Sequence, residues 1–208
     1  MKTNSKTLQV LLWIVCSLFM TGCRNMKVKY EGFSSSPSAS MRLVESDLRK
    51  YMAEVPGAAN RDYLFCLDQT ITDGSFGFQL KDNQVRMFGG DEIGVTHAFY
   101  TLLEELGYTF DVTGVSVPAV KKDLSLLTDK SITPKVRWRG IRQHVNFPMD
   151  ISSYSIDDAK EYINSLLRMR FNKIAFHSYP GQWYETQVGD SLETSFMAIL
   201  ILCMTANF

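Results

Sequence analysis

Residues 136–145 (VRWRGIRQHV), 155–169 (SIDDAKEYINSLLRM) and 173–177 (KIAFH) decide the fold of the second half of the chain. The first and third segments are typical of strands, and the middle segment has helical periodicity. Ser155 is a suitable N-cap for this helix, whose apolar stripe comprises Ala159, Tyr162, Ile163, Leu166 and Leu167. Because strand, helix and strand follow one another directly, the pattern predicts a βαβ unit with parallel strands.

The preceding residues show a different pattern, which predicts a small α+β layer domain. One helix is expected over 41–52, with Ser40 as its N-cap. A second is expected from its N-cap Asp91 to a stop at Gly107. The expected strands are 26–30, 63–67, 77–81 and 84–88. The last two strands are joined by Asp82-Asn83, which predicts a hairpin turn.

The boundaries of these parts follow from changes in polarity along the chain. We expect the layer domain to span 26–120, ending soon after Pro118. The stretch 121–134 is polar and closes on Pro134, so it is expected to be a linker. The βαβ unit then occupies 135–185.

Two features near the second expected helix could carry a function. His97 could be a ligand or a base, but no residue is spaced in sequence to join it, which favours a histidine on the flank of the helix. Gly89-Gly90 before Asp91 could cradle a phosphate. No glycine-rich fingerprint surrounds the pair, so a tight strand-to-helix turn is the preferred interpretation.

Composition excludes several classes of protein. The 208 residues are 45% apolar and 21% charged, which excludes collagen-like, disulfide-knot and disordered chains. The 22 basic and 22 acidic side chains give a formal charge of zero, so no nucleic-acid partner is expected. No two cysteines have the spacing of metal ligands, and Cys66 reads as a small buried apolar residue. We therefore expect neither a metal nor another cofactor.

The amino terminus has the pattern of an export signal. Two lysines precede the apolar run 8–20, which is shorter than a membrane-spanning helix of about 20 residues. The run ends in Phe19-Met20-Thr21-Gly22-Cys23, which resembles the bacterial lipobox. This resemblance implies a signal peptide over 1–22 and lipidation of Cys23. The mature protein would be anchored to a bacterial membrane, in the periplasm or at the cell surface. The alternative is an ordinary signal followed by an incidental cysteine.

A family resemblance rests on Arg139-Gly140-Ile141, the helix that follows, and 170–177 (RFNKIAFH). Together they resemble the first strand, first helix and second strand of the catalytic TIM barrel in β-N-acetylhexosaminidase-like glycoside hydrolases. Residues 85–108 resemble the accessory α+β domain before such barrels, which also precedes α-glucuronidase barrels. The resemblance implies an α+β accessory domain followed by an incomplete α/β, TIM-barrel-like βαβ segment, with an oligo- or polysaccharide as partner.

Departures from the family pattern leave the sugar open. Pro180-Gly181 stands where the family has paired acidic residues, and no arginine occupies the region of Phe147. A hexosamine, a uronic acid and another glycan all remain candidates.

The candidate sugar contacts follow from the position of barrel active sites at the carboxyl ends of strands. Arg142 and His144 end the first strand and can donate to hydroxyls or a carboxylate. His177 ends the second strand, and Trp183 and Tyr184 after it can stack on a pyranose ring. The alternative for these aromatic residues is a place in the core. Further candidates at the same ends are Asn146, Tyr179 and Gln182.

The catalytic residues are not identified by the sequence. Glycoside hydrolysis ordinarily needs two carboxyl groups, and only Glu185 is close to an expected strand end. The 74 residues from Lys135 to Phe208 allow about two and a half of the eight βα units of a barrel. The tail, 186–208, departs from the pattern, so we expect a reading frame truncated near residue 186 and an inactive chain. The alternative function is that of a non-enzymatic surface lipoprotein that binds glycans.

Overall fold

The computed structural model describes residues 26–34, 36–144 and 151–177, which form an α+β fold. The three α-helices of these residues are α2 (Ala39–Met52), α3 (Glu92–Glu105) and α4 (Ile156–Arg168). The strands of the main sheet are β1 (Val28–Glu31), β2 (Asp62–Leu67), β3 (Phe76–Lys81), β4 (Gln84–Gly89) and β7 (Lys130–Ile132). The remaining strands are β5 (Thr109–Asp111), β6 (Gly114–Ser116), β8 (Gly140–His144) and β9 (Lys173–His177).

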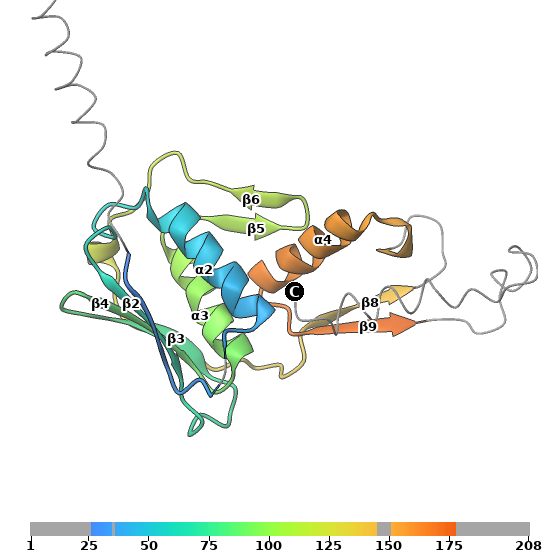
Figure 1. Ribbon diagram of the computed structural model, residues 1–208, viewed down its shortest axis with the longest axis horizontal. Coiled ribbons are helices and arrows are strands. Elements are labelled where there is room, and N and C mark those ends of the chain that lie inside the picture. Colours follow the sequence, from blue (N-terminus) through green and yellow to red (C-terminus); the bar gives the residue numbers. More distant parts are fainter. Residues whose placement is uncertain (1–25, 35, 145–150, 178–208) are drawn as a thin grey trace, which may run out of the picture.

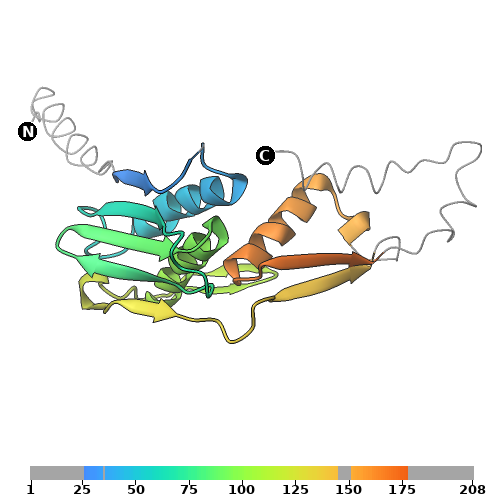
Figure 2. The same cartoon turned by 90° about the horizontal axis from the view of Figure 1, so that it is seen from below.

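The main sheet is mixed and has the order β1-β2-β4-β3-β7. The pairs β1–β2 and β2–β4 are parallel, whereas β3 pairs antiparallel with both β4 and β7. The β3–β4 hairpin turns at Asp82, whose φ of 50° lies in the left-handed region, so the predicted turn is confirmed. Helices α2 and α3 lie on one face of this sheet, and β8 and β9 extend away from it (Figures 1 and 2).

Helix α3 is the centre of the hydrophobic core. Every residue from Gly94 to Leu103 is buried, because the sheet covers one side of the helix while α2 and α4 contact the other sides. A helix that is apolar all round is expected only in such surroundings. The burial of Thr96, His97 and Thr101 on it shows that polar side chains also had to find partners within the core.

The helix caps agree with the sequence in two cases and differ in one. Asp91 accepts a hydrogen bond from the backbone N–H of Gly94, and Ser155 accepts one from Asp158, as predicted. The prediction of Ser40 as the cap of the first helix was wrong. Ser38 is the N-cap and accepts from Met41 N, so the helix begins earlier and places Ser40 in its first turn.

The stretch expected as a linker contributes to the sheet. It includes the short 3-10 helix η2 (Leu124–Leu126), whose Leu124 is fully buried, and strand β7. Strand β7 can approach β3 closely because Gly77 has no side chain. A Cβ there would lie 2.0 Å from the carbonyl oxygen of Lys130. Residues 130–132 are therefore part of the layer that was expected to end near Pro118.

The βαβ unit has the predicted elements, but its first strand is shorter than expected. Strand β8 begins at Gly140, whereas the sequence predicted a strand from Val136. Before Gly140 the backbone is held by Asn172, whose backbone N–H donates to the carbonyl of Arg139 and whose side chain makes two further hydrogen bonds. The Asn172 amide accepts from Arg139 N and donates to the carbonyl of Arg137. Strands β8 and β9 are parallel, and α4 connects them.

Gly89-Gly90 forms a tight turn between β4 and α3. A Cβ on Gly89 would lie 2.5 Å from the backbone carbon of Gly94, so only glycine permits this approach of strand to helix. The N–H of Gly94 is already bonded to Asp91, which fills the place that an anion would take. The strand-to-helix interpretation is thus the one that the geometry supports.

Candidate functional site

The register of β8 and β9 brings two of the predicted sugar contacts together along the backbone. His144 pairs with His177 at the carboxyl ends of the two parallel strands, and Arg142 pairs with Ala175. These residues are 33 positions apart in the sequence, and the crossover through α4 places them side by side. The carboxyl ends of parallel strands are where α/β proteins bind ligands.

Contacts of β8 with α4 show which face of the strand pair is open. The side-chain amide of Gln143 donates to the hydroxyl of Tyr162 on α4, so Gln143 faces the helix. Because side chains alternate along a strand, Arg142 belongs to the opposite face. Arg142 is exposed there, as a contact with a ligand requires. The sequence alone did not show which face of the strand Arg142 lies on, and the hydrogen bond between Gln143 and Tyr162 places Arg142 on the face opposite α4.

Several predicted site residues lie outside the described residues. They are Cys23, Asn146, Tyr179, Gln182, Trp183, Tyr184 and Glu185. Of His144 and His177 only the backbone is described. The sugar contacts stay a prediction; the described residues give the backbone register of His144 and His177 and the exposure of the Arg142 side chain.

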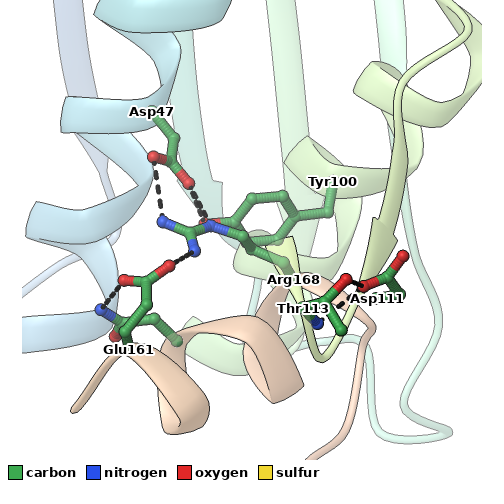
Figure 3. A network of polar contacts seen from close by, with 7 residues as sticks. Asp47, Tyr100, Asp111, Thr113, Glu161 and Arg168 are labelled. Carbon is green, nitrogen blue, oxygen red and sulfur yellow. Dashed lines mark hydrogen bonds and ion pairs between the residues drawn. The ribbon is translucent and has the colours of Figure 1, made fainter. Parts of the chain in front are cut away.

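A buried ionic network, which the sequence did not reveal, joins the two parts of the molecule (Figure 3). The guanidinium of Arg168, at the end of α4, donates through Nε to Asp47 of α2 over 2.8 Å and through Nη1 to Glu161 over 2.6 Å. The hydroxyl of Tyr100, on α3, donates to the same Asp47 oxygen over 2.9 Å. The side chains of Arg168 and Asp47 are only 8% and 5% exposed. We call these four residues the Asp47 network.

The opposite charges of the Asp47 network stabilise one another, which offsets the cost of burying them. Burial lowers the pKa of Arg168, but hydrogen bonding and attraction to Asp47, with a smaller contribution from Glu161, more than offset it and raise the pKa above its usual value. Burial, with the nearby Asp47 carboxylate, raises the pKa of the Tyr100 hydroxyl well above its ordinary range. Arg168 therefore stays cationic and Tyr100 stays protonated throughout the neutral range, as their donor roles require.

A second cross-link, nearer the start of the strands, contains His97. Its ring is 1% exposed and lies between Arg139, whose Nη2 is 3.2 Å from Nδ1, and the carbonyl of Phe171, which is 3.4 Å from Nε2. His97 lies on α3, as expected, but its side of the helix is covered by segments distant in the sequence, at Arg139 and Phe171. Beside it, Arg170 donates to Glu104 and Thr101 of α3.

Some expected properties can be compared only with the described residues. Within 26–34, 36–144 and 151–177, no three His, Cys, Asp or Glu side chains gather in a way that could hold a metal ion. In the same ranges no helix has the length and apolar character needed to cross a membrane. Cys66 is buried, as predicted, and its sulfur accepts a hydrogen bond from Arg86. Absence of a cofactor stays a prediction.

A shallow hollow of about 510 Å³ lies on the accessory layer, and Arg142 is not among the residues that line it. Its walls come from the end of α3 and from the stretch around η2 and β7, including Lys122, Leu126 and Asp129. The ion pair between Lys130 and Glu105 forms part of its wall. The Asp129 carboxylate accepts a hydrogen bond from the backbone N–H of Leu80.

The fold is found in solved glycoside hydrolases. A GH138 enzyme targeting pectin rhamnogalacturonan II matches with a TM-score of 0.51 and 12% identity, over 73% of this chain and 18% of that enzyme. The GH20 β-N-acetylhexosaminidase from Streptomyces coelicolor A3(2) matches with a TM-score of 0.46 and 17% identity, over 74% of this chain and 30% of that enzyme. The GH20 exo β-N-acetylglucosaminidase from Vibrio harveyi matches with a TM-score of 0.47 and 17% identity, over 74% of this chain and 22% of that enzyme.

These matches describe architecture and leave chemistry to be tested. The chain spans less than a third of the length of each of these enzymes. The sequence matches no protein-family model and no curated protein. At 12% identity, the likeness to the GH138 enzyme concerns the fold: this chain has an α+β fold whose structural neighbours are glycoside hydrolases.

Proposed function

We propose that this chain supplies the accessory layer and the first βαβ unit of a glycoside hydrolase that acts on glycans. The observation that carries the proposal is the parallel register of β8 and β9, which aligns His144 with His177 at the strand ends. Arg142 stands exposed on the face that α4 leaves open. The fold shared with the GH138 enzyme is in keeping with this assignment.

The proposed sugar contacts are Arg142, His144 and His177, together with Trp183 and Tyr184. Guanidinium groups pair with carboxylates through two parallel hydrogen bonds, which suits the acid group of a uronic acid. Indole and phenol rings stack on the apolar face of a neutral or N-acetylated pyranose. The two sugar classes therefore depend on different members of the set.

Calorimetric titration of the full chain with an oligogalacturonate and with a chito-oligosaccharide tests the proposal. We expect one of them to bind, and we expect Arg142→Ala or Trp183→Ala to weaken binding by about tenfold or more. Arg49→Ala is the matched control, because this exposed arginine of α2 pairs with Glu45 far from the strand ends. The proposal is overturned if neither oligosaccharide binds, or if binding survives both substitutions unchanged.

Hydrolysis by the chain itself is not expected. Strands β8 and β9 contain no carboxylate, whereas glycoside hydrolysis ordinarily uses two. We propose that this chain alone binds a glycan and does not cleave it, which is also the behaviour of a non-enzymatic glycan-binding lipoprotein. A panel of aryl glycosides checks this, since steady turnover would refute it.

We further propose that the protein is exported and anchored through a lipid on Cys23. Support comes from the sequence alone, in the lipobox-like residues 19–23 that follow an apolar run. Acyl chains contribute about 0.8 kcal/mol per buried methylene, so several on one residue hold a protein at a membrane. Labelling of bacterial cells with an alkyne fatty acid should mark the wild type and Cys66→Ser, and the label should disappear in Cys23→Ser. Retention of label in Cys23→Ser would overturn the idea.

A further inference from the structure

His97 joins two segments that are distant in the sequence but lie next to each other at the start of β8 and β9. Arg139 immediately precedes β8, and Phe171 lies two residues before β9. Both are tied to the same imidazole ring of α3, on opposite nitrogens. The ring of Phe76 on β3 packs edge-on against the imidazole, with centroids 5.3 Å apart, so the histidine is enclosed from the sheet side as well.

The partners fix the protonation state of this ring. A guanidinium only donates hydrogen bonds, so Nδ1 of His97 must present its lone pair to Arg139. The ring proton then resides on Nε2 and is donated to the carbonyl of Phe171. Only the neutral Nε2–H form satisfies both contacts, because a second proton on Nδ1 would place a donor against a donor.

The charged groups around the ring oppose a second proton. Arg139 contacts it directly, and Arg170 of the turn between α4 and β9 adds a further positive charge. Asp91, the N-cap of α3, acts in the opposite sense but more weakly than either the burial or Arg139. Arg170 itself forms an ion pair with Glu104 of α3.

We propose that His97 is a proton-sensitive latch: its neutral ring ties Arg139 to α3, and its protonation releases Arg139 and with it the start of β8. The latch comprises His97 and Arg139, while the Nε2–H bond to the carbonyl of Phe171 is kept in both protonation states. The Asp47 network forms a separate attachment at the end of α4 and contains no histidine. Acidification should therefore loosen the start of β8 while α4 remains docked.

The direction of the pH effect follows from the pKa of the ring. Burial, followed by the charge of Arg139, lowers the pKa of His97 from its ordinary 6.5 to about 4. Between these values the released ring binds a proton that the closed latch excludes. The latch is therefore fully stable above pH 6.5 and loses stability as the pH falls toward 4.

Hydrogen exchange of the full chain between pH 7 and pH 4 tests the latch. Protection factors, which remove the intrinsic pH dependence of exchange, should fall at residues 140–141 by about tenfold per pH unit below 6.5. Those of β2 and β4 should not follow. In His97→Gln the amide can accept from Arg139 and donate to Phe171 but does not ionise, so the pH dependence should disappear. His144→Gln should retain it.

A second measurement keeps the inference falsifiable if His97→Gln fails to fold. Substituting the other two of the three histidines, His144→Gln and His177→Gln, leaves His97 as the only imidazole in the chain. Long-range nitrogen–proton spectra should then show the Nε2–H form at pH 7 and a titration midpoint near 4. The proposal is overturned by the Nδ1–H form, by a midpoint near 6.5, or by protection that falls equally in His97→Gln. None of these outcomes depends on glycan binding.

Discussion

A carboxylate inside a protein is stable only where other groups replace the water that it has lost. Asp47 is buried and meets this condition through Arg168 and Tyr100, which donate to it from two other helices. No buried side-chain nitrogen or oxygen among the described residues lacks a partner. The buried ion pair of Asp47 and Arg168 therefore has its hydrogen bonds complete, and the loss of either residue would leave the other charge buried without a partner.

Arg168→Ala should lower the free energy of unfolding by about 3–5 kcal/mol, because it leaves Asp47 charged and buried without its cation. Chemical denaturation monitored by circular dichroism measures the change. The double variant Arg168→Met with Asp47→Leu should recover much of the loss, since it removes both charges. Arg49→Ala is the control, and its exposed ion pair should contribute less than about 1 kcal/mol. Equal effects of Arg168→Ala and Arg49→Ala would contradict the account.

At the scale of single elements, the boundary of α2 is decided by two serines. Ser38 accepts from Met41 N at 3.4 Å, whereas Ser40 is bonded to the Ser38 hydroxyl. Ser38→Ala should therefore destabilise the protein by about 1 kcal/mol, and Ser40→Ala by less. Thermal unfolding of the two variants side by side decides this. A larger effect at Ser40 would restore the cap that the sequence suggested.

The sequence predicted most elements, because their signals are local. Periodicity placed α2, α3, α4 and the strands β2 to β4 within a few residues of their bounds. Strand β7 was not predicted, because three residues are too few to show an alternation of apolar and polar side chains. Its position in the sheet depends on Gly77, more than 50 positions earlier. Likewise Asp47 looks like an ordinary surface residue of a helix. Its burial depends on Arg168, 121 positions away, which no local pattern reports.

The candidate site could be predicted only as far as strand ends can be read from a sequence. Strand β9, Lys173–His177, has the expected bounds, and β8 is described as far as His144, one residue before its expected end, which lies outside the described residues. Which side of β8 is open could not be read, because it depends on Gln143 meeting Tyr162. The role of His97 was missed for the same reason, as its partners come from a different part of the chain.

At the scale of the whole molecule, polar contacts among the described residues bind the accessory layer to the βαβ unit, including those of Asp47 with Arg168, Glu104 with Arg170, and His97 with Arg139. They come from α2 and α3 on one side and from α4, the turn after it and the segment before β8 on the other. Because all three are at least partly buried, undocking the βαβ unit would expose several unpaired polar groups at once.

We therefore expect the two parts to unfold in one transition. With Trp13→Phe and Trp183→Phe, fluorescence of the remaining Trp138 reports on the segment before β8, while circular dichroism reports on the whole chain. The two thermal midpoints should coincide. In a variant carrying Arg168→Ala and Arg170→Ala they should separate, with Trp138 changing first. Two resolved transitions in the unsubstituted background would show that the parts are independent.

The distance in sequence between Asp47 and Arg168 also has a consequence during synthesis. Ribosomes add about 5–20 residues per second, so the 121 residues between them correspond to roughly 6–24 s. Throughout that interval α2, joined by α3 once residue 105 has been added, lacks the cation that their shared surface requires. The nascent accessory layer therefore has to keep Asp47 hydrated, and its final packing is completed only when the end of α4 leaves the ribosome.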